Sequence, residues 1–344
     1  MPRPARTTPS RRALLGSAAV LSLALGGLAA CSTSEETQAA AQSTAGGSST
    51  YPLTLTSPFG ETTLEEKPEK VAVVSSVDLD IALSLGVVPV ISPLYGEAEL
   101  DPWETTALEG LGESDLTTYD STDGVDYEAI AAAAPDVILA TSGWTLDEDY
   151  EQLSKIAPIV SFQGADGLTG MTWAERTAEA GKALDLAAKA QEVVDGVAAK
   201  FEAAAAAHPE FAGRTYTYAV IHPEQITYES YDGSDTSFFE RLGFTLPAAA
   251  SRFSAGNQAV SRENVDVLDA DVLLVGYPFG DEGLLTRSAL ESDALFQQVP
   301  AVAGKHYAVV DDLVASPLAY PTPLSEVWVL DQLVPVLATA VAGS

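Results

Sequence analysis

Two segments of the chain share one pattern of polar and apolar positions. Residues 126–139 and residues 261–274 both begin with a helix-capping residue, and a glutamate follows two positions later, Glu128 in the first and Glu263 in the second. An apolar stretch, an aspartate and a β-branched run complete each segment. This order is typical of a short helix that leads into a buried strand. The chain is therefore predicted to contain one module twice.

A second similarity lies upstream of each module. Residues 81–87 resemble residues 238–244, and in both an apolar helical pattern ends on a glycine that can cap a helix. Two similar α/β lobes are therefore expected, and a cleft between two lobes is a common place for a small ligand.

Apolar runs alternate with segments of helical periodicity along the rest of the chain, which predicts mostly parallel sheets covered by helices on both faces. Strands are expected at residues 71–74, 87–91, 137–140, 157–160, 215–221, 272–275 and 306–310, and helices at 78–85, 147–155, 238–242, 292–297 and 325–340. Residues 92–122, which are rich in glycine and acidic residues, are expected to form a long irregular excursion.

Residues 172–207 contain no proline and keep apolar residues at helical spacing, which predicts one long helix or two nearly continuous ones. Such a connection would limit closure of the lobes. The expected fold is α/β, with two Rossmann-like lobes joined by one long backbone helix. Its expected parts are a signal peptide (1–30), a flexible tether (31–50), an N-terminal lobe (51–170), the linker helix (171–208) and a C-terminal lobe (209–344).

The first thirty residues have the pattern of a lipoprotein signal peptide. Four arginines precede a short apolar stretch, and small residues then lead to Cys31, the only cysteine of the chain. Cys31 is predicted to become the lipid-bearing N-terminus; the alternative is an ordinary signal peptide with a stray cysteine. Export by the general or by the twin-arginine route stays open. No later segment is expected to be long and apolar enough to span a membrane.

The net charge of the chain narrows the classes of partner that it can bind. Without its leader the chain has 13 basic and 49 acidic side chains, a net charge of −36. Binding to nucleic acid is excluded by that sign. With Cys31 lipidated the exported fold contains no disulfide, so its stability must come from two packed cores.

In the order of its motifs the chain resembles the class III substrate-binding lipoproteins of ATP-binding-cassette importers, which deliver ferric siderophores, haem or cobalamin. The motifs are residues 83–90, 128–140 and 153–160, the helix that opens on Trp173, and residues 238–243, 261–263 and 295–302. The resemblance implies a monomeric receptor, anchored by lipid to the outer face of the cytoplasmic membrane, with no intrinsic cofactor or metal. Its partners would be an iron chelate and a permease dimer with its ATPase.

The resemblance also implies a role for the two repeated glutamates. Family members use one exposed glutamate on each lobe to engage arginines of the two permease subunits, and Glu128 and Glu263 occupy the matching positions. The alternative is that each acid only complements the positive end of its helix.

Aromatic and arginine residues in loops at the lobe edges are the candidates for the ligand pocket. They are Tyr95, Trp103, Trp144, Tyr231, Arg252, Tyr277, Arg287 and Tyr320. The aromatics suit equally a protein core, and the two arginines suit surface ion pairs. Because no arginine lies between Tyr51 and Gly170, a cationic clamp would have to come from the second lobe. So few cations favour a neutral or weakly charged ferric hydroxamate over an anionic catecholate.

The residues of the chain also bear on other ligands and on catalytic activity. Direct capture of Zn²⁺ or Mn²⁺ would need more than three dispersed histidines. Haem remains an alternative because His222 lies near Tyr231 in the sequence, and cobalamin also remains open. An exported hydrolase is a remote alternative, since no Gly-x-Ser-x-Gly, His-Glu-x-x-His or phosphate-loop motif occurs.

Overall fold

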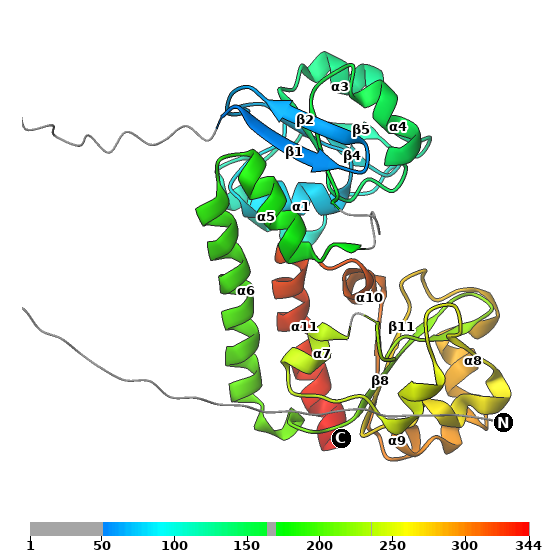
Figure 1. Cartoon of the computed structure of the whole chain (residues 1–344). Coiled ribbons are helices and arrows are strands. Elements are labelled where there is room, and N and C mark those ends of the chain that lie inside the picture. The colour runs from blue at the N-terminus through cyan, green and yellow to red at the C-terminus, as the bar shows by residue number, and fades with distance from the viewer. Residues whose placement is uncertain (1–50, 164–169, 235, 344) are drawn as a thin grey trace, which may run out of the picture. The chain divides into compact units, whose positions relative to one another are not determined.

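The computed structural model describes residues 51–163, 170–234 and 236–343. The predicted signal peptide, the tether and Cys31 lie outside these residues. Ser49–Ser344 form one compact unit. Within it are two lobes, each built around a sheet, and helices α6 (Ala187–Ala207) and α11 (Pro323–Ala342) run side by side from one lobe to the other (Figure 1).

The strands of the first lobe are all parallel apart from an N-terminal antiparallel hairpin that the sequence pattern did not predict. The hairpin consists of β1 (Leu53–Ser57) and β2 (Gly60–Leu64), and the sheet of β3 (Val71–Val73), β4 (Ser92–Leu94), β5 (Thr118–Asp120), β6 (Val137–Ala140) and β7 (Ile159–Ser161). The strand order is β7-β6-β3, and a single bridge between Ala72 and Ile91 continues it to the pair β4-β5.

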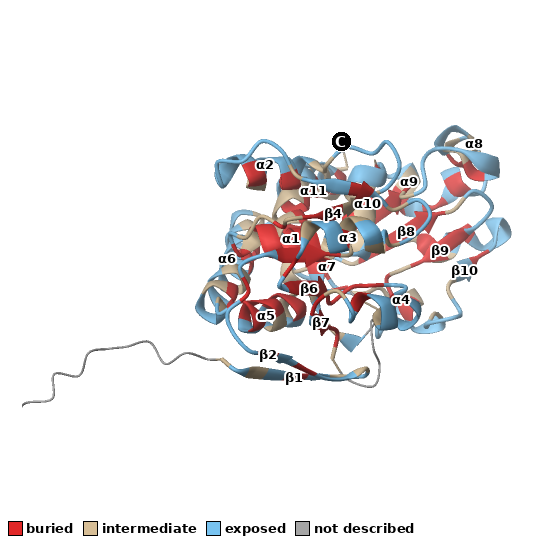
Figure 2. Cartoon of the chain, turned by 90° about the horizontal axis from the view of Figure 1, so that it is seen from above, coloured by how far each residue is buried: buried red, intermediate tan, exposed pale blue. Residues whose placement is uncertain are grey.

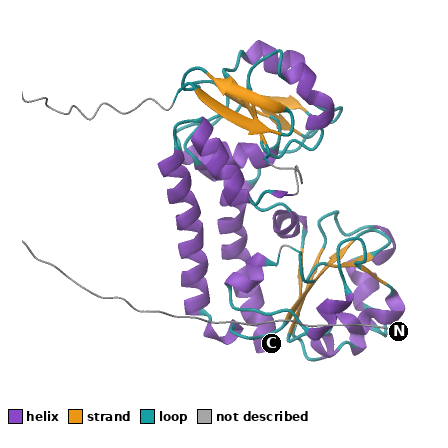
Figure 3. Ribbon diagram, in the orientation of Figure 1, coloured by secondary structure: helices purple, strands orange, loops and turns teal. Residues whose placement is uncertain are grey.

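Helices cover both faces of this sheet, as Figure 3 shows. They are α1 (Ser76–Ser84), α2 (Pro102–Gly110), α3 (Tyr127–Ala133), α4 (Leu146–Leu153) and α5 (Trp173–Ala183). Successive residues of β6 point to opposite faces: Val137 and Leu139 pack with α1 and α5, whereas Ile138 and Ala140 pack with α3 and α4. Many of the buried residues lie in the strands and in α1 (Figure 2).

Two expectations for this lobe were wrong. Residues 87–91 do not form a strand; only Val90 and Ile91 bond to β3, and Pro89 has no N–H with which to extend the ladder. The excursion at 92–122 is not irregular throughout, because it contains β4, α2 and β5. The start of α2 does have a signal in the sequence: Asp101 is followed by Pro102, and Glu104 accepts a hydrogen bond from the Asp101 N–H (2.7 Å).

The second lobe contains a mixed sheet in the order β10-β9-β8-β11-β12. Its strands are β8 (Tyr216–Ile221), β9 (Ile226–Tyr228), β10 (Ala259–Val260), β11 (Val272–Gly276) and β12 (Tyr307–Val310), and its helices are α7 (Ser237–Arg241), α8 (Arg287–Glu291), α9 (Pro300–Ala303) and α10 (Asp312–Ala319). The three strands β8, β11 and β12 are parallel, whereas β9 and β10 run antiparallel at one edge.

The helix expected at 292–297 was misplaced. Residues 287–291 form α8, and a separate short 3₁₀ turn follows at Phe296–Gln298. Thr286 caps the first by accepting from the Ala289 N–H (3.2 Å), and Asp293 accepts from the Leu295 N–H (2.8 Å) to begin the second. These two capping side chains set the starts of the two short helices on either side of residues 292–295, which are not helical.

The repeated module is an α-helix only in its first copy. Asp126 caps α3 by accepting from the Ala129 N–H at 2.9 Å. The second copy, η4 (Arg262–Leu268), is a 3₁₀ segment kinked at Asn264. There the Ser261 hydroxyl accepts from the Asn264 side-chain amide (2.9 Å) instead of from a backbone N–H, so the regular cap is absent.

The aspartate that directly precedes the strand of each module makes equivalent contacts in the two lobes. Asp136 accepts from the backbone N–H groups of Glu69 (3.0 Å) and Lys70 (2.9 Å), just before β3. Asp271 accepts from the N–H (2.8 Å) and the hydroxyl (3.0 Å) of Thr215, just before β8. Each carboxylate thus ties the start of its own strand to the start of the neighbouring strand.

The linker consists of two helices rather than one. Asp185, with φ at 57°, ends α5, and α6 begins two residues later. Gly181 permits the close approach of α5 and α6, because a Cβ there would lie 2.5 Å from the Ala190 Cβ. Of the two linker helices, only α6 runs from one lobe to the other. Helix α11 runs beside it (Figure 1).

Helix α11 is long and apolar enough to cross a membrane by length and composition, contrary to the expectation that no segment after the leader is. Its Leu333 and Leu337 are fully buried in the core of the second lobe. Burial of this kind explains the apolar composition as that of a core helix.

Candidate ligand-binding cleft

Three adjoining cavities lie where α10 and the α10–α11 turn meet the rest of the unit, and all three are lined by Tyr320. We refer to them by their most characteristic side chains: the acidic cavity (about 290 Å³), the tyrosine cavity (about 470 Å³) and the arginine cavity (about 240 Å³). Tyr320 is 56% exposed, and its ring packs edge-on against Trp144 of the β6–α4 loop at 5.8 Å. An aromatic corner therefore marks the point where the cavities meet.

The tyrosine cavity belongs to the second lobe. Tyr216, Tyr218 and Tyr231 line it together with His222 and Glu229. Burial raises the pKa of Tyr218 and of Tyr231, so both phenols stay protonated at neutral pH. Further lining comes from Phe239, Phe279 and Tyr320, which makes the walls mainly aromatic.

A glycine gives Tyr218 its place. A Cβ at Gly276 of β11 would lie 2.5 Å from the Tyr218 hydroxyl oxygen, so any other residue there would displace the phenol. The hydroxyl itself has no hydrogen-bond partner among the described residues.

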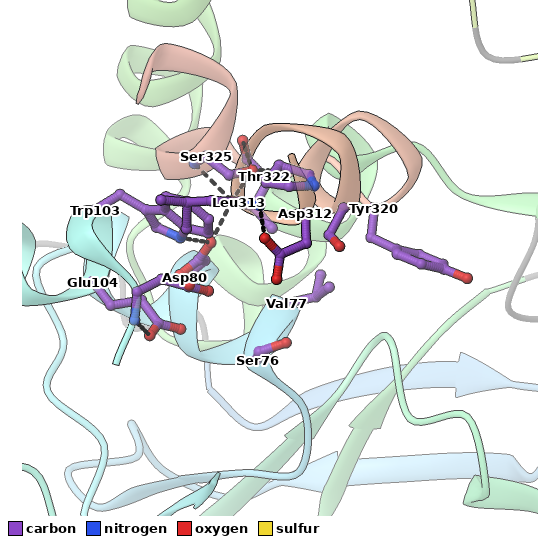
Figure 4. A pocket seen from close by; sticks show the side chains of 13 residues that line it. Ser76, Val77, Asp80, Trp103, Glu104, Asp312, Leu313, Tyr320, Thr322 and Ser325 are labelled. Carbon is purple, nitrogen blue, oxygen red and sulfur yellow. Dashed lines mark hydrogen bonds between the residues drawn. The ribbon is translucent and has the colours of Figure 1, made fainter. Parts of the chain in front are cut away.

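Carboxylates characterise the acidic cavity, which is lined by α1, α2, α10 and the start of α11. Asp80, Asp101, Glu104 and Asp312 all line it (Figure 4). Asp80 is 2% exposed, and its Oδ2 accepts from the Trp103 indole N–H (2.8 Å) and from the Thr322 hydroxyl.

The acids of this cavity raise one another's pKa values. Burial, and next the charge of Glu104, hold the pKa of Asp80 well above its ordinary value. Burial raises the pKa of Glu104 to about 7. Burial and the charge of Asp312 raise the pKa of Asp101. No lysine, arginine or histidine lines this cavity to offset them.

The arginine cavity contains a cation that sequence reasoning missed. Arg176 of α5 is 7% exposed, and burial lowers its pKa while the nearby charge of Asp78 acts in the opposite direction. A signal was present in the sequence. Arg176 follows Trp173 by three positions and precedes Ala180 by four, so it lies on the apolar stripe of its helix.

Four of the eight predicted pocket residues line the three cavities: Trp103, Trp144, Tyr231 and Tyr320. The other four line none of the three. Tyr95 is 69% exposed on the loop after β4, Arg252 is exposed, and Tyr277 lies in the core of the second lobe. Arg287 lines a separate surface hollow and pairs with Glu291 at 2.8 Å.

Glu128 and Glu263 are both exposed, at the first turn of α3 and of η4 respectively. Neither forms an ion pair within the described part of the chain. In the same part of the chain, no group of three or more histidine, cysteine, aspartate or glutamate side chains is arranged to hold a metal ion.

Comparison with known proteins identifies the fold. The family model described as periplasmic binding protein matches residues 71–313. The chain belongs to this family. It is therefore a binding protein rather than an enzyme, and the hydrolase alternative falls away. The resemblance to extracytoplasmic substrate-binding proteins of importers is confirmed, as is the two-lobed α/β fold.

Two of the similar proteins have names that refer to the binding or uptake of iron. The chain is 25% identical over 252 residues to the Fe(3+)-citrate-binding protein YfmC of Bacillus subtilis, which covers 71% of this chain and 73% of that protein. It is 27% identical to the iron uptake ABC transporter substrate-binding protein PiaA of Streptococcus pneumoniae, solved in complex with ferrichrome. That match has a TM-score of 0.69 and covers 85% of this chain and 99% of PiaA. A periplasmic solute binding protein of Mycobacterium smegmatis is 25% identical, with a TM-score of 0.71, and the match covers 84% and 98% of the two chains.

Proposed function

We propose that this protein captures a ferric siderophore outside the cytoplasmic membrane and delivers it to an ABC importer. Support comes from two similar proteins, the Fe(3+)-citrate-binding protein and PiaA with its bound ferrichrome, a hydroxamate chelate. A siderophore already supplies all the ligands of its iron, so a receptor needs walls for the chelate and no metal site of its own. Aromatic walls around the tyrosine cavity suit that task.

The charge balance of the cleft is the observation that favours a hydroxamate. Five carboxyl side chains line the three cavities, namely Asp80, Asp101, Glu104, Asp312 and Glu229, and the raised pKa values of Asp80 and Glu104 make these two contribute least to the negative charge. Arg176 is the one arginine among the lining residues, and no lysine is among them. A trianionic catecholate chelate would be repelled by this lining, whereas a neutral or cationic hydroxamate would not.

Titration of tryptophan fluorescence tests the proposal. Because Trp144 is 65% exposed and touches Tyr320, a bound ferric chelate is expected to quench it. We expect ferric hydroxamates to bind at least about tenfold more tightly than a ferric catecholate, a difference of about 1.4 kcal/mol. Trp144→Phe should remove part of the quenching. The matched control is Trp328→Phe, because Trp328 is half-buried and lines none of the three cavities. If no ferric siderophore quenches the protein, the proposal is wrong.

Haem is the second candidate, because His222 and Tyr231 line the same cavity. Burial lowers the pKa of His222, which keeps the imidazole neutral and able to coordinate iron. Burial raises the pKa of Tyr231, however, and so disfavours the phenolate that a tyrosine ligand requires. A Soret band that appears with hemin and is lost in His222→Ala would favour haem over a siderophore.

Docking to the permease dimer forms the second part of the proposal. Glu128 and Glu263 occupy the same position in the two modules, and both are exposed without an ion-pair partner among the described residues. Two carboxylates on one rigid unit suit two equivalent permease subunits, each offering arginine.

Attachment to the membrane is the third part. We propose that Cys31, which follows the apolar leader, bears the lipid that anchors the protein. Cells expressing Cys31→Ala should release the protein into the medium or periplasm and fail to incorporate radiolabelled fatty acid into it. Incorporation that persists in this variant would contradict the assignment.

A further inference from the structure

The residue directly before each proposed docking glutamate makes the same kind of contact in the two lobes. In the first lobe the Tyr127 hydroxyl donates a hydrogen bond to Asp149 of α4. In the second lobe the Nη2 of Arg262 donates to Asp293 at 2.8 Å. Each aspartate lies beyond the strand that follows its module. Different side chains occupy the position, so the contact recurs although the residues that make it do not.

In the first lobe this contact leads on to the ligand cleft. Asp149 is 9% exposed, and its other carboxylate oxygen accepts from the hydroxyl of Thr145, the residue at which α4 begins. Trp144, which directly precedes Thr145, lines the arginine cavity and packs against Tyr320. In the second lobe Asp293 instead accepts from backbone N–H groups of the turn at Phe296–Gln298, and that turn lines none of the three cavities.

The shared carboxylate holds the starts of two helices together. Helices α3 and α4 contribute to one apolar cluster on the same face of the first sheet (Figure 1). Apolar packing has no preferred direction, whereas a hydrogen bond to a buried carboxylate does. A shift of α3 relative to α4 would leave an oxygen of Asp149 without its donor, which is costly in a buried group. The first turns of α3 and α4 are therefore expected to move together.

We propose that Asp149 is a positioning residue that couples the ligand contact at Trp144 to the docking surface at Glu128. A chelate that touches Trp144 restrains the first turn of α4, and the contact between Asp149 and Tyr127 extends that restraint to the first turn of α3. Coupling between two sites is reciprocal, so displacement of α3 on docking also weakens the hold of Trp144 on the chelate. The inference rests on the proposed function and assigns to the first lobe a link between capture and delivery.

Hydrogen–deuterium exchange with and without ferrichrome tests the coupling. The backbone N–H groups of Ala129 and Ile130 report on the first turn of α3, because they bond to the side chain and the carbonyl of Asp126. Neither residue lines any of the three cavities. In the wild-type protein, saturating ferrichrome should slow their exchange by about threefold or more, together with exchange in the first turn of α4.

Variants separate coupling from simple support of the fold. Tyr127→Phe removes one hydroxyl from a half-buried ring and interrupts the contact between the helices. Ferrichrome should then still slow exchange in α4, but the change in α3 should fall below about 1.5-fold, with affinity within about twofold of the wild type. A contact that only supports the fold would leave the response of α3 to ligand in place.

A second variant and a matched control accompany Tyr127→Phe. Asp149→Ala removes both hydrogen bonds and should also abolish the response of α3. Because Asp149 is buried, its folding is checked by circular dichroism, and Tyr127→Phe decides if it fails to fold. The control is Tyr150→Phe, which removes a tyrosine hydroxyl from the same helix; the ring of Tyr150 stacks on Phe59 at 4.5 Å. Both helices should respond to ferrichrome in this control as in the wild type.

The outcomes separate the coupling from the function on which it rests. If ferrichrome quenches tryptophan fluorescence but does not slow exchange at Ala129 and Ile130 in the wild type, the coupling is wrong and siderophore capture stands. Slowing that persists in Tyr127→Phe also overturns it, because the ligand then acts on α3 by another route. Loss of the response in Tyr150→Phe would deny Asp149 a specific role. If ferrichrome does not bind, hydroxamate capture is wrong and the coupling with it.

Discussion

The two lobes share a fold and differ in the polar groups that they bury. The first lobe buries carboxylates, among them Asp78, Asp80 and Glu104. In the second lobe most of the large buried polar side chains are tyrosines, such as Tyr218 and Tyr277, and the buried Glu326 is neutralised by Arg241. Carboxylates need donors or a shared proton to be buried, whereas a phenol is tolerated at lower cost. The shared pattern therefore sets the scaffold, and the differing buried groups determine the chemistry of the cleft.

Replacement of Asp78 in the first lobe is expected to cause the largest loss of stability. The Asp78 carboxylate accepts from the Ser75 hydroxyl (2.6 Å), the Thr141 N–H (2.9 Å) and the Thr141 hydroxyl. Asp78→Ala leaves these buried donors without an acceptor and is expected to lower the free energy of unfolding by about 3 kcal/mol or more. Urea denaturation followed by circular dichroism measures it. Asp126→Ala, the exposed cap of α3 in the same lobe, is the control and should cost only about 1 kcal/mol. Similar losses for the two variants would mean that burial of the Asp78 carboxylate adds no extra cost.

The repeated glutamates test whether the lobes are equivalent at the importer. The double variant Glu128→Ala/Glu263→Ala is expected to reduce iron uptake by cells about tenfold or more, since each charge pair at an interface typically contributes over 1 kcal/mol. Ligand affinity in fluorescence titration should not change. Asp266→Ala, an exposed acid of η4, is the control. Single variants with equal effects would support two-fold docking, whereas normal uptake by the double variant would rule it out.

The raised pKa of Glu104, in the first lobe, predicts that the stability of the protein depends on pH. Burial raises the pKa of Glu104 to about 7 in the folded protein, from an ordinary value of 4.5. Between these values the folded state binds more protons than the unfolded state, so stability falls as the pH rises from about 4.5 to about 7. Glu104→Gln should remove about 1–2 kcal/mol of that decline.

Denaturation at pH 5 and pH 8 measures this effect. The Gln side chain can still accept from the Asp101 N–H, so the capping contact of α2 is retained in the variant. Glu113→Gln, an exposed acid, should leave the decline as it is in the wild type. If Glu104→Gln loses as much stability as the wild type between the two pH values, Glu104 does not hold the proton.

Replacement of the Tyr277 hydroxyl in the second lobe is expected to change stability least. The Tyr277 ring is 4% exposed, and its hydroxyl has no hydrogen-bond partner among the described residues. Tyr277→Phe removes only that hydroxyl, so unfolding free energy should change by less than about 0.5 kcal/mol. A loss above about 1 kcal/mol in urea denaturation would reveal a partner and would weaken the contrast with Asp78.

Much of the fold could be predicted from the sequence because its signals are local. The buried strands β6 and β11 are continuous apolar runs, β8 begins with an alternation of threonine and tyrosine, and α3 begins at a capping residue. Errors occurred where a side chain redirected the backbone. Asn264 bonds to Ser261 and turns the second module into a 3₁₀ segment, and Pro89 moves the strand from 87–91 to β4.

The candidate site was less predictable. Loop position after a strand correctly indicated Trp144 and Tyr231 as cavity-lining residues, but the same rule applied to Tyr277, which points into the core. Arg176 was missed because an arginine on the linker helix was not compared with the apolar stripe around it. The acidic cavity collects residues from α1, α2 and α10, separated by more than 200 positions, and no local pattern connects them.

The sequence by itself determined the duplicated architecture and the paired glutamates, because periodicity, capping residues and apolar runs act over a few neighbouring residues. Only the tertiary structure decided what the cleft contains. The return of α11 beside α6 places Thr322 against Asp80 and Tyr320 against Trp144. These contacts join distant parts of the chain, so they depend on how the lobes pack and not on the local pattern of either lobe.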